Sequence, residues 1–162
     1  MFERESRLFG LMITYCRQLT DDLADHQLHE RAAPNANSPG WILGHLAVAT
    51  DYALRLLGHE PQCPESWHRH FGMGSTPPQS ANDYPSKAEL LGALSRGHEL
   101  TCAAVASAPG DRLRAPHGYE LFQRTPVQTV GDLVAHLMTT HIAMHLGQLS
   151  YWRRVNGHGP LF

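Results

Sequence analysis

The feature that most limits this chain's fold is a helical repeat of apolar residues, at spacings of three and four, in four separate stretches. The stretches run from about Phe2 to His26, Ser38 to Gly58, Ser86 to Ala106 and Thr129 to Val155. No strand pattern competes, and the best short candidate, residues 118–128, is interpreted as a loop. We therefore predict an all-α fold, a four-helix bundle formed by a single domain over residues 1–162.

Capping residues mark where three of these helices begin. Each is a hydroxyl side chain able to accept a hydrogen bond from a free amide of the first turn: Ser38, Ser86 and Thr129. Pro39 suits the first helical position, where a missing N–H costs nothing. Glu89 and Asp132 stand three residues after the other two caps, which is the spacing of a capping box.

The connection between the second and third helices, from about residue 58 to residue 85, is unusually long. It contains Trp67, Phe71 and Tyr84, which predicts a packed segment. A connection of this length allows the chain to cross the whole bundle, so that helices 2 and 3 are parallel neighbours or lie diagonally. We predict a long crossover connection between these two helices.

Charge and cysteine content exclude several classes of protein. The formal net charge is −2, so no basic excess indicates binding to nucleic acid or to a membrane surface. No stretch approaches the 18 or so apolar residues of a membrane span, and the charged start of the chain does not resemble a signal peptide. The three Cys are far apart in sequence, which is typical of free thiols in the cytoplasm.

His141 and His145 are the residues most informative about function. They stand four apart in the last helix, so both imidazoles leave the same face and can share one metal ion. Residue 142 is Ile, which excludes the H-E-x-x-H metalloprotease motif. Two histidines held only by hydrogen bonds remain the alternative.

A third histidine makes a metal site the economical interpretation. His45 lies on the apolar stripe of the second helix, between Ile42 and Ala49. With His141 and His145 it forms a set of three ligands, which leaves a coordination position open for a substrate. His136 would lie about 140° from His141 on a regular helix and is predicted to serve in packing or at an interface. His98 is a candidate for an indirect role behind the ligands.

The motif G-W-I-L-G-H-L around His45, followed by H-x-x-x-H-x-G-Q-L and W-R-R-x-x-G, resembles the DinB-like (YfiT-like) superfamily of bacterial four-helix bundles. The resemblance implies a divalent metal ion, zinc or nickel, held by His45, His141 and His145. Gly147 and Gln148 match the G-Q that follows the last ligand. Enzymes of this superfamily include transferases and isomerases that use a low-molecular-weight thiol such as bacillithiol or mycothiol.

We therefore expect a metal-dependent reaction in which a low-molecular-weight thiol attacks an electrophilic small molecule. Asp51 is predicted on the outer face of the second helix and Glu99 on the flank of the third, so neither is placed as a general base. The alternatives are a non-enzymatic or stress-associated bundle with a structural or vestigial metal site, and a histidine-lined bundle without metal. A homodimer is also expected, from apolar groups predicted to face outward, Leu133 and Ile142.

Overall fold

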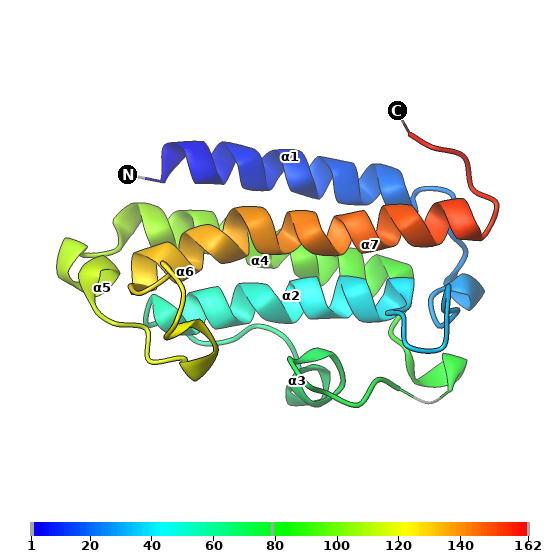
Figure 1. Ribbon diagram of the computed structural model, residues 1–162, viewed down its shortest axis with the longest axis horizontal. Helices are drawn as coiled ribbons and strands as arrows, with labels where there is room; N and C mark the ends of the chain where they lie inside the picture. Colours follow the sequence, from blue (N-terminus) through cyan, green and yellow to red (C-terminus); the bar gives the residue numbers. More distant parts are fainter. Residues whose placement is uncertain (1, 79, 162) are drawn as a thin grey trace.

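Four long helical segments lie side by side in the computed structural model, which describes residues 2–78 and 80–161 (Figure 1). They are α1 (Glu3–Thr20), α2 (Pro39–Leu56), α4 (Lys87–Ser107), and a C-terminal segment of α6 (Val130–His136), a π turn (η4, Leu137–His141) and α7 (Ile142–Val155). Shorter helical elements are α3 (Glu65–Phe71), α5 (Gly110–Arg114) and the 3-10 turns η1 (Asp25–Gln27), η2 (Ala81–Asp83) and η3 (Glu120–Phe122). The described residues contain a single isolated bridge, Pro116 with Thr129, and no strand. The predicted all-α fold is confirmed.

Helices α2 and α4 run in the same direction, opposite to α1 and α7 (Figure 1). The end of α2 and the start of α4 therefore lie at opposite ends of the bundle. The connection, residues 57–86, returns along the bundle and carries α3 on its way (Figure 1). This arrangement confirms the predicted long crossover.

The predicted helix starts are also confirmed. Ser38 accepts a hydrogen bond from the Trp41 amide, and Pro39 is the first residue of α2. Ser86 with Glu89 and Thr129 with Asp132 form complete capping boxes at α4 and α6. These local signals therefore fix where three of the long helical segments begin.

The end of α1 is fixed by a residue of α4. Helix α1 stops at Thr20, before the predicted His26. The Lys87 ammonium donates to the carbonyl oxygens of Thr20, Asp21 and Leu23 at 2.9, 3.2 and 2.5 Å. These carbonyls have no partner within α1, so a cation from a neighbouring helix caps its C-terminus.

Only one of two adjacent apolar faces of α1 is buried. Phe9, Ile13 and Cys16 are buried, whereas Leu8 and Leu11 are 42% and 56% exposed. The helix carries two apolar stripes side by side, and both have helical spacing. Spacing alone could not decide which stripe faces the core.

Asp51 is fully buried, and its predicted position on an outer face was wrong. Its carboxylate accepts the backbone N–H groups of Gln62 and Cys63 at 2.7 and 2.9 Å. The ring of His68 donates to it through Nε2 at 2.9 Å. The crossover covers this side of α2, so Asp51 anchors the returning chain to the bundle.

Leu133 and Ile142 are buried, so the prediction that they face outward was wrong. The π turn lies between them and rotates the residues of α6 relative to those of α7 around the helix axis. The homodimer remains a prediction, but these two residues no longer support it. Light scattering at micromolar concentration checks it, with twice the 18.0 kDa chain mass as the expected result.

Arg153, in the last turn of α7, is also buried. It forms an ion pair with Asp22 and donates to the Leu19 carbonyl at 2.9 Å. The pairing holds the Asp22 carboxyl pKa well below its usual range, mainly through the hydrogen bond from Arg153. This contact ties the end of α7 to the chain that follows α1.

Gly97→Ala is expected to destabilise the fold by about 2 kcal/mol, because α2 and α4 touch at this position. A Cβ at Gly97 would lie 1.9 Å from the Thr50 hydroxyl oxygen and 2.7 Å from its Cβ. Gly92→Ala, on the same helix with nothing within 4 Å, is the matched control and is expected to stabilise by up to about 1 kcal/mol. Urea unfolding midpoints measure both changes, and equal shifts would contradict this packing.

Candidate metal centre

Three histidines from two segments of the bundle meet at one point. His45 comes from α2, His141 from the end of the π turn and His145 from the first turns of α7. One ligand atom of each lies within 4.8 Å of the others, and the Nε2 atoms of His45 and His141 are 3.1 Å apart. Two nitrogen ligands of one tetrahedral ion are separated by about 3.3 Å. The structure thus brings together the three residues singled out in the sequence, in positions suited to binding a metal ion.

The crossover orients His45. Its Nδ1 donates to the Phe71 carbonyl at 2.7 Å, so the proton is on Nδ1 and the Nε2 lone pair faces the other two rings. Phe71 can lie this close because residue 44 is Gly, where a Cβ would be 2.5 Å from the Phe71 ring. The Trp41 indole stacks on His45, with centroids 4.6 Å apart and planes 9° from parallel. The His45 ring is therefore fixed before any ligand binds.

The π turn brings His136 toward the site. A π turn has more residues per turn than an α-helix, so the angle between residues five apart is smaller than on a regular helix. The His136 and His141 rings lie 5.8 Å apart, and His136 Nδ1 lies 2.6 Å from the Thr140 hydroxyl. His136 nevertheless falls outside the group of three ligand atoms. Its ring packs on Phe122, with centroids 5.5 Å apart, which agrees with the predicted packing role.

The three rings are held neutral. Burial, and to a smaller extent the neighbouring imidazoles, lower the pKa of His141 to about 3 and that of His145 to about 4. Burial also lowers the pKa of His45. Neutral imidazole is the form that binds metal ions.

Protein groups do not satisfy all the nitrogens of these rings. The Nδ1 atoms of His141 and His145 are buried without a hydrogen-bond partner among the residues that the structure describes. The nitrogen of His141 that faces His45 is Nε2, so an ion bound there would leave the Nδ1 of His141 without a partner. The fit to a divalent ion therefore rests on the donor set and its neutrality.

A pocket of about 460 Å³ opens beside the three histidines. Its walls come from α2, the crossover, the loop before α6 and the C-terminal segment. They include Trp41, Tyr52, Leu56, Met73, Tyr119, Leu121, Phe122, Leu133, His136 and Met144. A ligand in this pocket would contact the candidate metal position directly.

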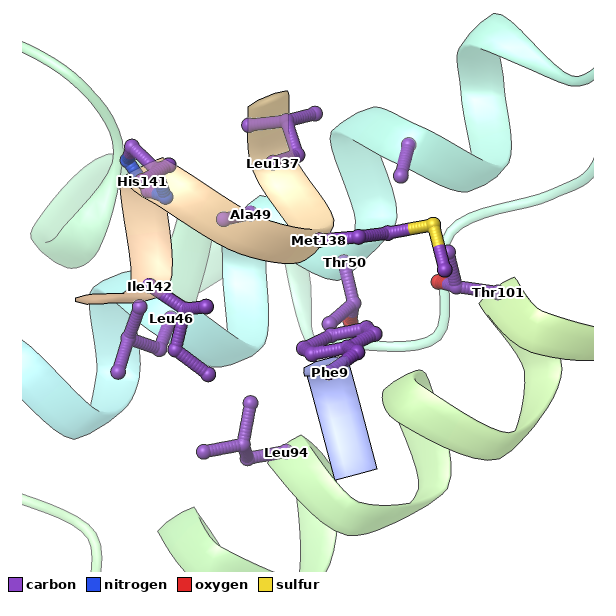
Figure 2. A pocket seen from close by; sticks show the side chains of 11 residues that line it. Phe9, Leu46, Ala49, Thr50, Leu94, Thr101, Leu137, Met138, His141 and Ile142 are labelled. Atoms are coloured by element: carbon purple, nitrogen blue, oxygen red, sulfur yellow. The ribbon is translucent and has the colours of Figure 1, made fainter. Parts of the chain in front are cut away.

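The opposite side of His141 is closed. Figure 2 shows a small cavity lined by apolar side chains of α1, α2, α4 and the π turn, with His141 at its edge. Phe9, Leu46 and Met138 lie on this side of His141 (Figure 2). The candidate site therefore lies between a packed core and an open pocket.

Other histidines and polar residues have different roles. His98 packs on Phe9, with ring centroids 4.8 Å apart, at the contact between α1 and α4, so its predicted role behind the ligands is not supported. Gln148 opposes the lowering of the His145 pKa by burial, and its amide oxygen accepts from Asn37 at 3.0 Å. Sequence reasoning missed Trp41 and the Phe71 carbonyl. The position of Trp41, one helical turn before His45, is the one feature of the sequence that could have indicated the contact between these two rings.

Within residues 2–78 and 80–161, no helix combines the length and apolarity that crossing a bilayer requires. Comparison with the curated proteins finds no match. One similar solved structure is a crystal structure of the conserved protein of a locus from Enterococcus faecalis. It shares 18% identity over 96% of each chain, with a TM-score of 0.71, and it supports the fold alone.

The family model of the DinB superfamily matches residues 10–149, which include all three clustered histidines. The match covers most of the sequence and contains α2, α4, the π turn and the ligand-bearing part of α7. We conclude that this chain belongs to the DinB superfamily.

Proposed function

We propose that the protein binds a divalent ion, zinc or nickel, through His45, His141 and His145 and uses it to activate a low-molecular-weight thiol toward an electrophilic small molecule. The observation that carries the proposal is the convergence of three neutral and largely buried imidazoles at the wall of an open pocket. Three protein ligands leave a position free for a substrate.

When bound, such an ion supplies Lewis acidity, which lowers the pKa of a coordinated thiol toward neutrality. The chain itself supplies orientation and exclusion of water. The Phe71 carbonyl and the Trp41 ring hold His45 in one orientation, and the packed side of His141 keeps water from the core face. In the overall reaction the new S–C bond replaces the bond to the leaving group, and the thiol proton passes to solvent.

The walls of the pocket favour thiol chemistry over hydrolysis. None of its lining residues, among those the structure describes, is Asp or Glu, so no carboxylate is positioned to activate water. A thiol needs no such base because the ion would lower its pKa. A non-enzymatic metal-binding protein is the second candidate, since the same absence of a base fits a site without chemistry.

A turnover screen on untagged protein separates the two candidates. The protein is loaded with zinc or nickel and mixed with 1-chloro-2,4-dinitrobenzene and one of glutathione, cysteine, bacillithiol or mycothiol. We expect release of chloride and the S-aryl product at least 10-fold faster than without protein for one of the thiols. His45→Ala should lose the acceleration. A loaded protein that accelerates none of them would support the non-enzymatic candidate.

A further inference from the structure

The pocket beside the three histidines carries no formal charge on its walls. Among the described residues that line it, none is Arg, Lys, Asp or Glu. Aromatic and aliphatic side chains form most of the surface, with Tyr52, Tyr119 and Phe122 as rings along the walls. We propose that this pocket selects an uncharged ligand with an aromatic or branched alkyl body and one metal-binding head group. The inference rests on the proposed metal site and narrows the class of substrate that this site would accept.

The size and walls of the pocket support this selection. A volume of about 460 Å³ lies in the range of small-molecule sites. Placing a carboxylate against these walls removes part of its hydration without supplying a cationic partner, which is unfavourable. An apolar body of the same size would instead gain from leaving water. The walls therefore discriminate against charge and favour an apolar ligand.

The rim of the pocket points to the same chemistry. Met73, Leu121 and Met144 line the pocket and are 64%, 62% and 57% exposed. Large apolar side chains grouped at a pocket mouth are typical of a ligand-binding surface. Three such residues at one opening suggest that the apolar body of the ligand extends to the rim.

Two arginines at the end of α2 do not line the pocket. Arg112 donates to the carbonyl oxygens of Leu56 and Arg55 at 2.7 and 3.4 Å, which holds its guanidinium at the end of α2. Arg55 acts electrostatically on Tyr52 but does not line the pocket. The neutral polar groups on the walls, the two Tyr hydroxyls and the His136 ring, suit a hydroxyl or carbonyl of an uncharged ligand.

Matched ligand pairs test the inference on cobalt-loaded protein. Phenylmethanethiol is compared with 4-(sulfanylmethyl)benzoate, and benzohydroxamate with its 4-carboxylate, so that each pair differs by one charge. Binding is followed by the cobalt absorption spectrum and, in parallel, by the thermal shift of the protein. We expect the uncharged body to bind at least 10-fold more tightly in each pair.

A variant at the rim provides the specific control. Leu121→Arg adds a cation at the pocket mouth on an exposed residue and is expected to reduce the preference to less than 3-fold. Leu11→Arg changes an equally exposed Leu of α1, away from the pocket, and should leave the preference unchanged. Both variants replace exposed side chains, so both should fold.

The outcomes separate this inference from the proposed function. Equal or tighter binding of the charged members overturns the inference, and so does the absence of binding by both uncharged members. If thiols bind without preference, the proposed function stands and the inference fails. If only the hydroxamates bind, with the expected preference, thiol chemistry fails and the inference stands. A protein that takes up no cobalt refutes the metal site and, with it, the inference, which requires a metal-bound head group.

Discussion

Replacing His45, His141 or His145 with Ala is expected to lower the affinity for a divalent ion by more than about 100-fold. That exceeds the 10- to 100-fold losses typical of removing the groups that merely orient metal ligands. Each of the three supplies one of the clustered nitrogen atoms, and two imidazoles alone bind weakly. The measurement is the metal content of untagged protein after dialysis against a competing chelator. About one ion per chain is expected for the unmodified protein.

His136→Ala is the matched control for these variants. His136 lies on the same C-terminal segment, lines the same pocket and has its ring 5.8 Å from that of His141, but it is outside the cluster. Its loss should leave the metal content unchanged. Equal loss from His136→Ala would show that the ligand assignment is wrong.

Removing the ion is the second change with a large expected effect. An ion present at 1,000 times its dissociation constant stabilises the folded state by about 4 kcal/mol. For a chain of this length that corresponds to about 10 °C in melting temperature. The apo protein should stay helical, because the four long helical segments bury a continuous apolar core without the ion. Melts of loaded and chelated protein at pH 7.5, followed by circular dichroism, measure the difference.

Acid is expected to destabilise the folded protein through these histidines. The folded-state pKa values of about 3 for His141 and about 4 for His145 lie below the usual 6.5 of an unfolded histidine. Between these values the unfolded chain binds protons that the folded chain does not, so stability falls as the pH falls. The contribution is complete above about pH 6.5 and is lost as the pH falls through the folded-state pKa values.

Protons also compete with the ion for the same nitrogens, so the difference in melting temperature between loaded and chelated protein should shrink below pH 7.5 and vanish by about pH 3. Identical melting temperatures already at pH 7.5 would instead mean that the three histidines hold no ion of consequence. That result would refute the proposed function together with the ligand assignment.

The features that could be predicted from the sequence are those set by local chemistry. Ser38, Ser86 and Thr129 satisfy amides of their own first turns, so the sequence alone locates these helix starts. The spacing of His141 and His145, and the apolar neighbours of His45, were enough to select the three residues that the fold brings together. The long crossover followed from the length of the connection between residues 58 and 85.

The features that could not be predicted depend on packing between distant segments. The π turn at Leu137–His141 changes the angles between Leu133, His136 and Ile142 around the helix axis. No residue pattern in the sequence indicates this turn. The burial of Asp51 requires the crossover to return over α2. The pocket is likewise shared by four segments that are far apart in sequence, so its uncharged walls appear only in three dimensions.

The hydrogen bonds of Lys87 have a consequence for chemical modification of the protein. Lys87 is the only lysine of the chain, and its ammonium is engaged by three carbonyl oxygens at the end of α1. Amine-directed reagents, such as active esters used for labelling or surface attachment, therefore meet one side-chain amine, and it reacts only after leaving those carbonyls. Acylation at that nitrogen would also remove its charge and with it the cap of α1.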